Sequence, residues 1–240
     1  MARRAARLRR RAALLRGGAR GARRRPRRLR ARAPRRAGPS LRELRRCGGR
    51  EVTRPGTRPF VLLDRDGTLL EEREYAFRLE DYAALPGAHA AVARLRASGF
   101  GVVVLSNQSG IARGIFGEAD HSRFAARLRE DFASHGAALD GYYHCPHAPD
   151  AGCDCRKPRT GLALRAMREH GVDLARSFVI GDKDVDVELA RNLGCRGILV
   201  RTGHGAAHVG RVPPGTPIAR DLADAVERFV LADAAAQRVT

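Results

Sequence analysis

The sequence predicts an α/β fold in which helices cover both faces of a parallel sheet of about five strands. Three features indicate this fold: short apolar segments alternate with amphipathic ones, the apolar segments end in polar loops, and Phe60–Leu63 is apolar at every position. A short, uniformly apolar run bounded by turn residues is typical of a parallel strand that is buried on both faces. Because alternating strands and helices form right-handed βαβ units, we expect one three-layer sandwich.

The remaining elements follow in order along the chain. Strands are predicted at 102–105, around 141–143, at 177–180 and at 197–200. Helices are predicted from Pro86-Gly87 to Ser98 and at 118–135, 161–170, 185–193 and 220–232. In the helix at 118–135, Phe124, Leu128 and Phe132 recur every four residues, which places them on one inward face. Residues 71–85 have no clean period, so we interpret them as a loop or small flap over the carboxylates that precede them.

An Arg-rich extension is predicted at residues 1–57, followed by one domain at 58–240. Residues 1–58 hold 23 Arg and only two acids, a balance of +21 in a chain whose net charge is +20, so the rest of the chain is close to neutral. Since the extension has few apolar side chains to bury, we expect it to be disordered in isolation.

Three interpretations of the extension stay open. It can bind nucleic acid or anionic surfaces through phosphate contacts, although no aromatic residue precedes Phe60. It can be a transit peptide, although it contains a single Ser, Ser40. It can also lack an evolved role, since two Lys against 44 Arg indicate a GC-rich coding sequence. In that case the assigned start is wrong, and the working protein is expected to begin near Val52.

The rest of the chain shows neither an export signal nor a membrane span. No apolar segment has the length and flanks of a signal peptide or the length of a transmembrane helix. Three of the five Cys lie within eleven residues, beside histidines, which favours metal binding over disulfides and indicates a reducing compartment. We therefore expect a cytoplasmic protein, and a monomer.

Polar side chains follow the predicted strands where these end. They are Asp64 and Asp66, Ser106 and Asn107, and Asp182, with Asp184 and Asp186 expected as supporting or helix N-terminal charges; a loop adds Arg156 and Lys157. Ligands of open α/β sheets bind beyond the carboxyl ends of the strands. Carboxylates without His or Cys among them suit Mg²⁺, and a hydroxyl with a lysine suits the oxygens of a phosphoryl group. One Asp can then attack phosphorus to form an aspartyl-phosphate, while a second exchanges protons.

A second metal site is predicted from the spacing Cys145-x-His147-x₅-Cys153-x-Cys155. Three thiolates and one imidazole form a closed tetrahedral zinc site with no position left for water. We therefore expect a structural Zn²⁺ that fixes the loop carrying Arg156 and Lys157. We do not expect His144, Cys47 or Cys195 to bind this zinc ion. The remaining histidines have no ligand spacing and are expected in solvated or helix-end positions: His89, His121, His135, His170, His204 and His208.

These motifs resemble those of a known family. The chain resembles the haloacid dehalogenase (HAD) superfamily of phosphatases in Asp64-x-Asp66-Gly67-Thr68, the strand end at Ser106, Lys157 and Gly181-Asp182. It is similar to the D-glycero-D-manno-heptose 1,7-bisphosphate 7-phosphatases, relatives of the histidinol-phosphatases, in Asn107-Gln-Ser-Gly-Ile-Ala-Arg-Gly114, Cys145-Pro-His147, Cys153-Asp-Cys155-Arg-Lys-Pro158 and Gly181-Asp-Lys183. The resemblance covers residues 58–235 in order and implies a Rossmann-like HAD fold with a minimal cap.

The resemblance also implies an activity and its residues. It implies Mg²⁺-dependent hydrolysis of the 7-phosphate of a small sugar bisphosphate through an aspartyl-phosphate. Asp64 is the implied nucleophile, Asp66 the general acid/base, and Ser106 and Lys157 the groups that stabilise the transferring phosphoryl group. Mg²⁺ is implied at Asp64, Asp66 and Asp182. Substrate contacts are implied at Asn107, Gln108, Ser109, Arg156, Lys183 and Tyr75.

Two departures from the family pattern leave the substrate open. The segment Glu72-Arg73-Glu74-Tyr75 matches the family only at Tyr75, and the loop from His147 to Cys153 is as short as in the histidinol-phosphatases. Histidinol phosphate or another small sugar phosphate is therefore an alternative substrate, although Ile111-Ala-Arg113-Gly114 favours the heptose branch. An alternative of another class is a nucleic-acid-binding protein that uses its Arg-rich extension.

Overall fold

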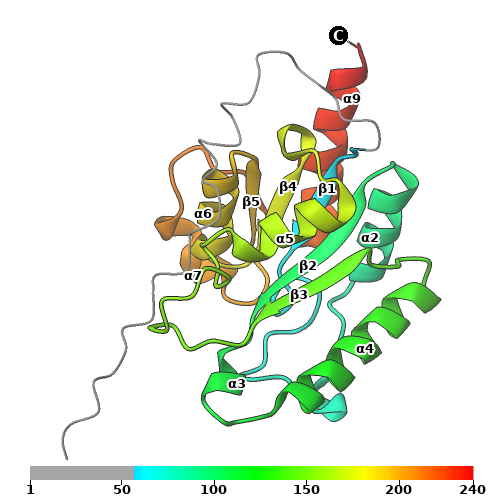
Figure 1. The fold of residues 1–240 in the computed structure, drawn as a ribbon. Helices are drawn as coiled ribbons and strands as arrows, with labels where there is room; N and C mark the ends of the chain where they lie inside the picture. The colour runs from blue at the N-terminus through cyan, green and yellow to red at the C-terminus, as the bar shows by residue number, and fades with distance from the viewer. Residues whose placement is uncertain (1–56, 240) are drawn as a thin grey trace, which may run out of the picture. The chain divides into compact units, whose positions relative to one another are not determined.

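The described part of the chain, residues 57–239 of a computed structural model, contains one parallel sheet (Figure 1). Its strands lie in the order β3-β2-β1-β4-β5-β6. They are β1 (Phe60–Leu63), β2 (Gly101–Asn107), β3 (Gly141–Cys145), β4 (Phe178–Gly181), β5 (Arg196–Val200) and β6 (Ile218–Ala219). The chain leaves β1 toward β2 on one side and returns to β4 on the other, so the point where the strand order reverses lies at β1. Ligand sites in such sheets lie at this reversal point, at the carboxyl ends of the strands.

Helices cover both faces of the sheet. They are α2 (Ala88–Ala97), α3 (Ser109–Ala112), α4 (Glu118–Ser134), α5 (Gly161–His170), α6 (Asp184–Leu193), α7 (Gly205–His208), α8 (Leu222–Ala225) and α9 (Ala232–Val239), with a π-helical turn at Val226–Leu231 and short 3₁₀ turns at Leu79–Asp81, Leu174–Arg176 and Val209–Arg211. Because successive strand side chains point to opposite faces, Val61 and Leu63 pack with α2, α4 and the C-terminal helices, whereas Phe60 and Leu62 pack with α5 and α6. The two cores and the sheet between them form three layers.

The predicted strands and helices are confirmed. The short helices α3 and α7, of four residues each, were not predicted. β6 was not predicted, because a strand of two residues is too short to show a pattern; it pairs with β5 through Leu199 and Val200. The last helix continues beyond its predicted end at residue 232, since α8, the π-helical turn and α9 follow one another without a break to Val239.

The segment between β1 and α2 is the small flap that the sequence predicted. It holds the 3₁₀ turn at Leu79–Asp81 and one bridge between Leu70 and Ala84. In the described residues no further domain is inserted here, so the minimal cap is confirmed. The extension and the expected start near Val52 fall outside the described residues.

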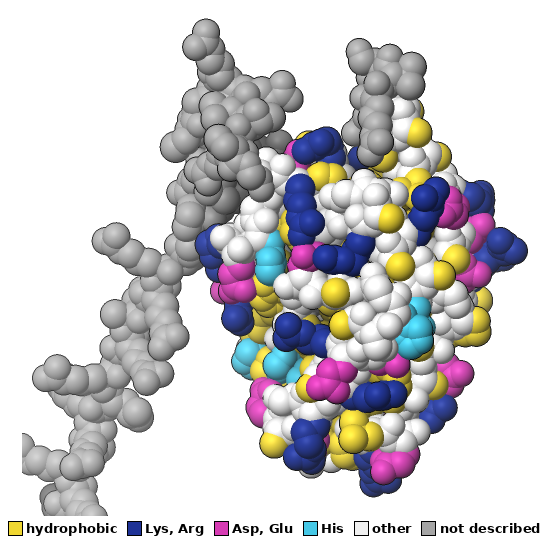
Figure 2. All heavy atoms as spheres, turned by 90° about the vertical axis from the view of Figure 1, so that its right-hand side faces the viewer, with side chains coloured by type: hydrophobic (Ala, Val, Ile, Leu, Met, Phe, Trp, Pro, Cys, Tyr) yellow, Lys and Arg dark blue, Asp and Glu magenta, His cyan; other side chains and the backbone are white. Residues whose placement is uncertain are grey.

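The described surface carries mixed charge. Figure 2 shows Lys and Arg side chains interspersed with Asp and Glu on one face, rather than gathered by sign. This agrees with a domain that is close to neutral once the extension is set aside. None of the described helices is long and apolar enough to cross a membrane.

Candidate active site

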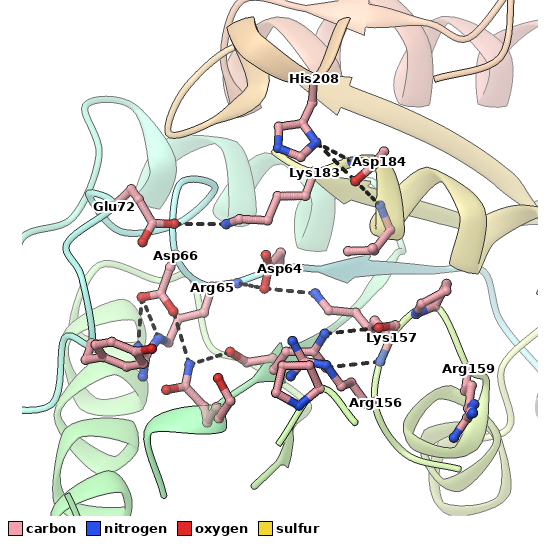
Figure 3. A pocket seen from close by; sticks show the side chains of 18 of the residues that line it. Asp64, Arg65, Asp66, Glu72, Arg156, Lys157, Arg159, Lys183, Asp184 and His208 are labelled. Carbon is pink, nitrogen blue, oxygen red and sulfur yellow. Dashed lines mark hydrogen bonds and ion pairs between the residues drawn. The ribbon is translucent and has the colours of Figure 1, made fainter. Parts of the chain in front are cut away.

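A pocket of about 700 Å³ opens at the carboxyl ends of β1, β2 and β4 (Figure 3). Its walls come from the loop after β1, the end of β2, the loop after β3 and the start of α6. Asp182 does not line it, whereas all ten residues named from the sequence as catalytic or substrate-contacting do: Asp64, Asp66, Tyr75, Ser106, Asn107, Gln108, Ser109, Arg156, Lys157 and Lys183. Segments up to 119 residues apart in sequence therefore meet at one edge of the sheet.

The loop after β1 turns sharply beneath this pocket. Asp64 continues the sheet ladder, because its N–H donates to Ile180 O at 3.0 Å. The chain then turns at Gly67, whose φ of +76° is strained for residues other than glycine. A Cβ there would lie 2.3 Å from a carboxylate oxygen of Asp182. Gly67 thus lets the β1 loop close against the carboxylate that follows β4.

Three buried carboxylates and one lysine meet at the floor of the pocket. The ligating oxygens of Asp64, Asp182 and Asp186 all lie within 4.8 Å of one another. Lys157 Nζ lies 2.9 Å from Asp64 Oδ1 and 2.7 Å from Asp186 Oδ1, with its side chain only 2% exposed. Burial alone lowers the pKa of Lys157, but Asp186 and Asp64 outweigh burial and raise it, so the lysine is charged. Lys183 Nζ, 3.1 Å from Asp182 Oδ1, adds a second positive charge. Three acids against two lysines still leave a site of oxygen ligands with one excess negative charge when all are ionised, which could hold a hard cation.

Asp186 and Asp184 occupy the first turn of α6, as predicted. Asp186 accepts a hydrogen bond from the backbone N–H of Lys183 at 3.2 Å, and its other oxygen pairs with Lys157. Asp184 lies at the pocket rim, where its Oδ1 is 3.0 Å from His208 Nδ1.

Asp66 is held from both sides. Its Oδ1 accepts a hydrogen bond from Arg65 Nε at 2.8 Å, and its Oδ2 accepts one from Gln108 Nε2 at 3.1 Å. Gln108 Nε2 also donates to Ser106 Oγ at 2.7 Å, which joins the end of β2 to the acidic loop. Arg65 is itself buried; its guanidinium lies 4.8 Å from the centre of the Phe124 ring and donates to Ala76 O. The Asp66 carboxyl therefore has a fixed orientation.

The two acids of the loop have opposite pKa shifts. Burial raises the pKa of Asp64, but the charges of Lys157 and Lys183 outweigh burial and bring the pKa below its usual value. Burial raises the pKa of Asp66 as well, and the neighbouring Arg65 only partly offsets this. Two carboxyl groups whose environments push their pKa values apart can divide the roles of ionised group and proton donor.

Of two residues in the pocket wall, Asn107 has its amide fully hydrogen-bonded, whereas Arg156 has a polar atom without a partner. Asn107 forms a two-bond clamp on the backbone of Lys157: its Nδ2 donates to Lys157 O at 3.2 Å, and its Oδ1 accepts from Lys157 N–H at 3.0 Å. Its amide is thus engaged in positioning the lysine. Arg156, next along the loop, has a buried Nη1 with no hydrogen-bond partner among the described residues.

Glu72, Arg159 and His208 also line the pocket and were missed by sequence reasoning. Glu72 Oε2 accepts from Lys183 Nζ at 2.9 Å, and the same Nζ lies 3.1 Å from Asp182 Oδ1. Lys183 thereby ties the flap to the end of β4. The acidic composition of the flap was a usable signal for Glu72, but nothing in the local sequence marks Arg159 or His208.

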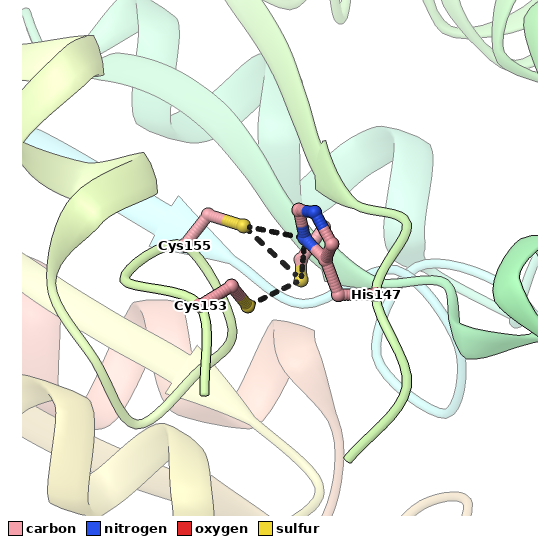
Figure 4. Close-up of side chains that lie close together, drawn as sticks. His147, Cys153 and Cys155 are labelled. Carbon is pink, nitrogen blue, oxygen red and sulfur yellow. Dashed lines mark hydrogen bonds between the residues drawn. The ribbon is translucent and has the colours of Figure 1, made fainter. Parts of the chain in front are cut away.

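The predicted cysteine cluster forms in the loop after β3 (Figure 4). Cys145 Sγ lies 3.5 Å from Cys153 Sγ and 3.2 Å from Cys155 Sγ, and His147 Nδ1 lies 3.2 Å from Cys155 Sγ. Four ligands about 2.3 Å from one ion would be roughly 3.8 Å apart, so these separations are close to those of a tetrahedral site. His144 stays outside the set and contacts Glu118 instead. The cysteines of the described residues are free thiols.

The chain matches a family model and full-length relatives. Residues 154–225 match the model described as "HAD-hyrolase-like". The chain is 44% identical over 170 residues to the D-glycero-beta-D-manno-heptose-1,7-bisphosphate 7-phosphatase of Pseudomonas aeruginosa, an alignment that spans 70% of this chain and 95% of that protein. It is 43% identical over 189 residues to the D-glycero-D-manno-heptose-1,7-bisphosphate 7-phosphatase of Thermosynechococcus vestitus, which spans 71% of this chain and 94% of that protein.

A solved structure is also similar. It is the crystal structure of D,D-heptose 1,7-bisphosphate phosphatase from B. bronchiseptica complexed with magnesium and phosphate. The match has a TM-score of 0.69 and 35% identity, and it covers 73% of this chain and 99% of that one.

The buried carboxylates make a testable prediction about stability. Burial and the nearby Asp64 raise the pKa of Asp182 to about 7. The unfolded chain releases this proton near pH 4, whereas the folded chain keeps it up to about pH 7. The folded state therefore loses stability progressively as the pH rises from about 4 to 7, and the loss reaches its full size above pH 7. In magnesium-free buffer, Asp182→Asn should therefore raise the free energy of unfolding by about 1–3 kcal/mol at pH 8, and by less at pH 5.

Urea denaturation at the two pH values measures this difference. The control is Glu188→Gln, which changes an exposed carboxyl of α6 and should have no effect at either pH. An Asp182→Asn variant that is less stable than the unchanged chain at pH 8 would contradict the prediction.

Proposed function

The chain belongs to the heptose-bisphosphate phosphatases of the HAD-like hydrolases, and we propose that it hydrolyses the 7-phosphate of D-glycero-D-manno-heptose 1,7-bisphosphate. As a member of this family it is a phosphoric monoester hydrolase. The observation that carries the proposal is the pair Asp64 and Asp66: two acids of one loop line one pocket, with opposite pKa shifts. A phosphatase that works through a covalent intermediate needs this combination of an ionised nucleophile and a protonated acid.

The pocket floor fits Mg²⁺. Its donors are carboxylate oxygens, the ligands that hard cations prefer, and Lys157 and Lys183 do not balance the charge of all three when these are ionised. The proposed ligands are Asp64, Asp182 and Asp66, the last through its backbone oxygen. When bound, Mg²⁺ supplies positive charge to the oxygens of the transferring phosphoryl group.

The proposed reaction has two steps. The Asp64 carboxylate attacks phosphorus, the bond from phosphorus to the ester oxygen breaks, and Asp66 gives its proton to the leaving sugar oxygen. Asp66 then takes a proton from a water molecule, which attacks the aspartyl-phosphate, releases inorganic phosphate and restores Asp64. Lys157 and Ser106 stabilise the phosphoryl oxygens in both steps, and Arg65 with Gln108 keeps the Asp66 carboxyl oriented.

Substrate contacts are proposed around the same pocket. Arg156 has a buried guanidinium nitrogen without a partner, which suits an anionic group of the substrate. Lys183 closes one side of the pocket, and Asn107, Gln108, Ser109 and Tyr75 line the remainder. The amides of Asn107 and Gln108 already bond to protein groups, so we assign these two residues mainly to holding Lys157 and Asp66.

The Cys₃His cluster is proposed to hold a structural Zn²⁺. The four side chains leave no room for a water ligand, and the cluster ends one residue before Arg156 and two before Lys157. Free thiols in this cluster suit a reducing compartment, which supports a cytoplasmic location. A monomer remains our expectation for the working enzyme.

The proposal is tested by a substrate panel. Phosphate release by the full-length chain with Mg²⁺ is measured on both anomers of heptose 1,7-bisphosphate, histidinol phosphate and simple sugar phosphates. We expect kcat/KM for the β-anomer to exceed that for every other compound by about 10-fold or more, since the loss of one good contact costs roughly that factor. A preference for histidinol phosphate would overturn the substrate proposal and keep the mechanism, whereas no release from any compound would overturn both.

The two acids have separable predicted effects. Asp64→Asn removes the nucleophile and should lower kcat by roughly 10³-fold or more. Asp66→Asn should lower kcat by about 10²–10⁴-fold, the usual contribution of general acid–base catalysis, and should slow both steps. Circular dichroism checks that both variants fold, and Glu188→Gln is the matched control with an exposed carboxyl. Activity of Asp64→Asn close to that of the control would exclude it as the nucleophile.

The zinc proposal makes a prediction of its own. Cys153→Ser should lose about one Zn²⁺ per chain and lower kcat, because the loop that carries Lys157 loses its anchor. The matched control is Cys195→Ser, which alters a free thiol outside the cluster. Metal content after dialysis is measured by mass spectrometry. Equal zinc in the two variants would rule out the Cys₃His site.

A further inference from the structure

Two helices bring a second kind of ligand set together away from the pocket. His89 lies near the start of α2, whereas Asp131 lies in the last turn of α4 and His135 directly follows that helix. Asp131 and His135 are four residues apart and therefore project from the same face of α4. The ligating atoms of the three side chains all lie within 4.8 Å of one another. None of the three lines the active-site pocket.

Hydrogen bonds fix the tautomer of His135 and the orientation of Asp131. His135 Nδ1 lies 2.8 Å from the backbone oxygen of Asp131, which can only accept. The Nδ1 atom therefore carries the proton, and Nε2 keeps a free lone pair, as in most metal-bound histidines. Tyr82 OH donates to Asp131 Oδ2 at 2.6 Å and orients that carboxylate. The His89 ring packs on Phe132, with the ring centres 4.4 Å apart.

The donor set determines which ions suit the site. Two imidazoles and one carboxylate suit borderline transition-metal ions such as Zn²⁺, Co²⁺ or Cu²⁺, and not Mg²⁺, which prefers oxygen alone. The His89 side chain is 25% exposed and Asp131 is 14% exposed, so water can fill the remaining coordination positions. We propose that His89, Asp131 and His135 form a second transition-metal site, distinct from the Cys₃His cluster, that joins α2 to α4.

Metal binding requires a small rearrangement of these side chains. His89 Nε2 now donates to Asp131 Oδ2 at 2.6 Å, so this nitrogen must give up its proton to bind a metal ion, and the rings of His89 and His135 stack with their centres 4.1 Å apart. Ligands about 2.0–2.1 Å from one ion are roughly 3.3 Å apart, so the contact must open and the His135 ring must rotate. His135 is exposed at the end of its helix, and Arg127, 3.7 Å from Asp131, is half exposed and free to turn toward solvent.

Metal uptake by the full-length chain tests the proposal. After dialysis, Zn²⁺ is titrated by calorimetry into the unchanged chain, His89→Gln, His135→Gln and the control Glu130→Gln, an exposed acid beside Asp131. The unchanged chain and Glu130→Gln should bind about one Zn²⁺ more than either histidine variant, and added Zn²⁺ should raise their Tm further. His135→Gln keeps the test valid if His89→Gln fails to fold, because His135 is exposed.

Cobalt distinguishes this site from the cysteine cluster. Co²⁺ bound by thiolates gives an intense sulfur-to-metal charge-transfer band, whereas Co²⁺ bound by imidazole and carboxylate gives only weak d–d bands. We expect the Co²⁺ ion that binds at the second site, more weakly than the one at the cysteine cluster, to add d–d absorption without a thiolate band. This added absorption should be absent in His135→Gln. Equal uptake by His135→Gln and the unchanged chain would overturn the proposal. Phosphatase activity should be the same in both, so this result is independent of the proposed function.

Discussion

The buried ion pairs of Lys157 are the interaction on which the site depends. Its ammonium lies between Asp64 and Asp186, and Asp182, which pairs with Lys183, completes a cluster of three carboxylates. Removing a charge from water costs several kcal/mol unless it is paired, so this arrangement is tolerable only if the lysine stays in place. Two lysines still leave the three carboxylates with one excess negative charge when all are ionised, and this charge is the physical basis for proposing a hard cation there. The architecture around Lys157 therefore serves to hold one loop against the ends of three strands.

Two sets of contacts hold that loop, one to the Lys157 backbone and one just before Arg156. Asn107, at the end of β2, bonds to both polar groups of the Lys157 backbone. The Cys₃His cluster closes the loop just before Arg156, and a zinc ion there, as proposed, would fix it to Cys145 at the end of β3. The lysine in turn separates the two acids of the β1 loop: Asp64, next to it, has a lowered pKa, whereas Asp66 has a raised one. Lys157, with Lys183, thus distinguishes two chemically identical side chains.

The described residues hold three ligand sets that differ in donor atoms. The pocket floor offers carboxylate oxygens, the loop after β3 offers three sulfurs and a nitrogen, and the α2–α4 site offers two nitrogens and an oxygen. Hard ions prefer the first set, and borderline ions prefer the other two. The donor atoms alone would therefore direct the proposed magnesium and zinc ions to different sites, even if every site were equally accessible to both ions. The third set is partly exposed, with the His89 side chain 25% exposed and Asp131 14%, whereas the pocket floor is buried. Partial exposure suits exchangeable metal binding.

The sequence by itself determined most of the strands and helices and the polar residues that follow the strands, because each of these depends on local pattern. Short apolar or aromatic runs marked β1 to β5, polar residues at strand ends marked Asp64, Asp66, Ser106 and Asn107, and the family resemblance supplied the further substrate contacts of the same pocket. The cysteine spacing also marked its cluster, since all four ligands lie within eleven residues. Only the tertiary structure decided which groups pair: Lys157 with Asp186, Lys183 with Glu72, and His89 with Asp131. The partners of each pair lie 29 to 111 residues apart in sequence. No local pattern encodes such a contact, because the packing of the layers brings the two side chains together.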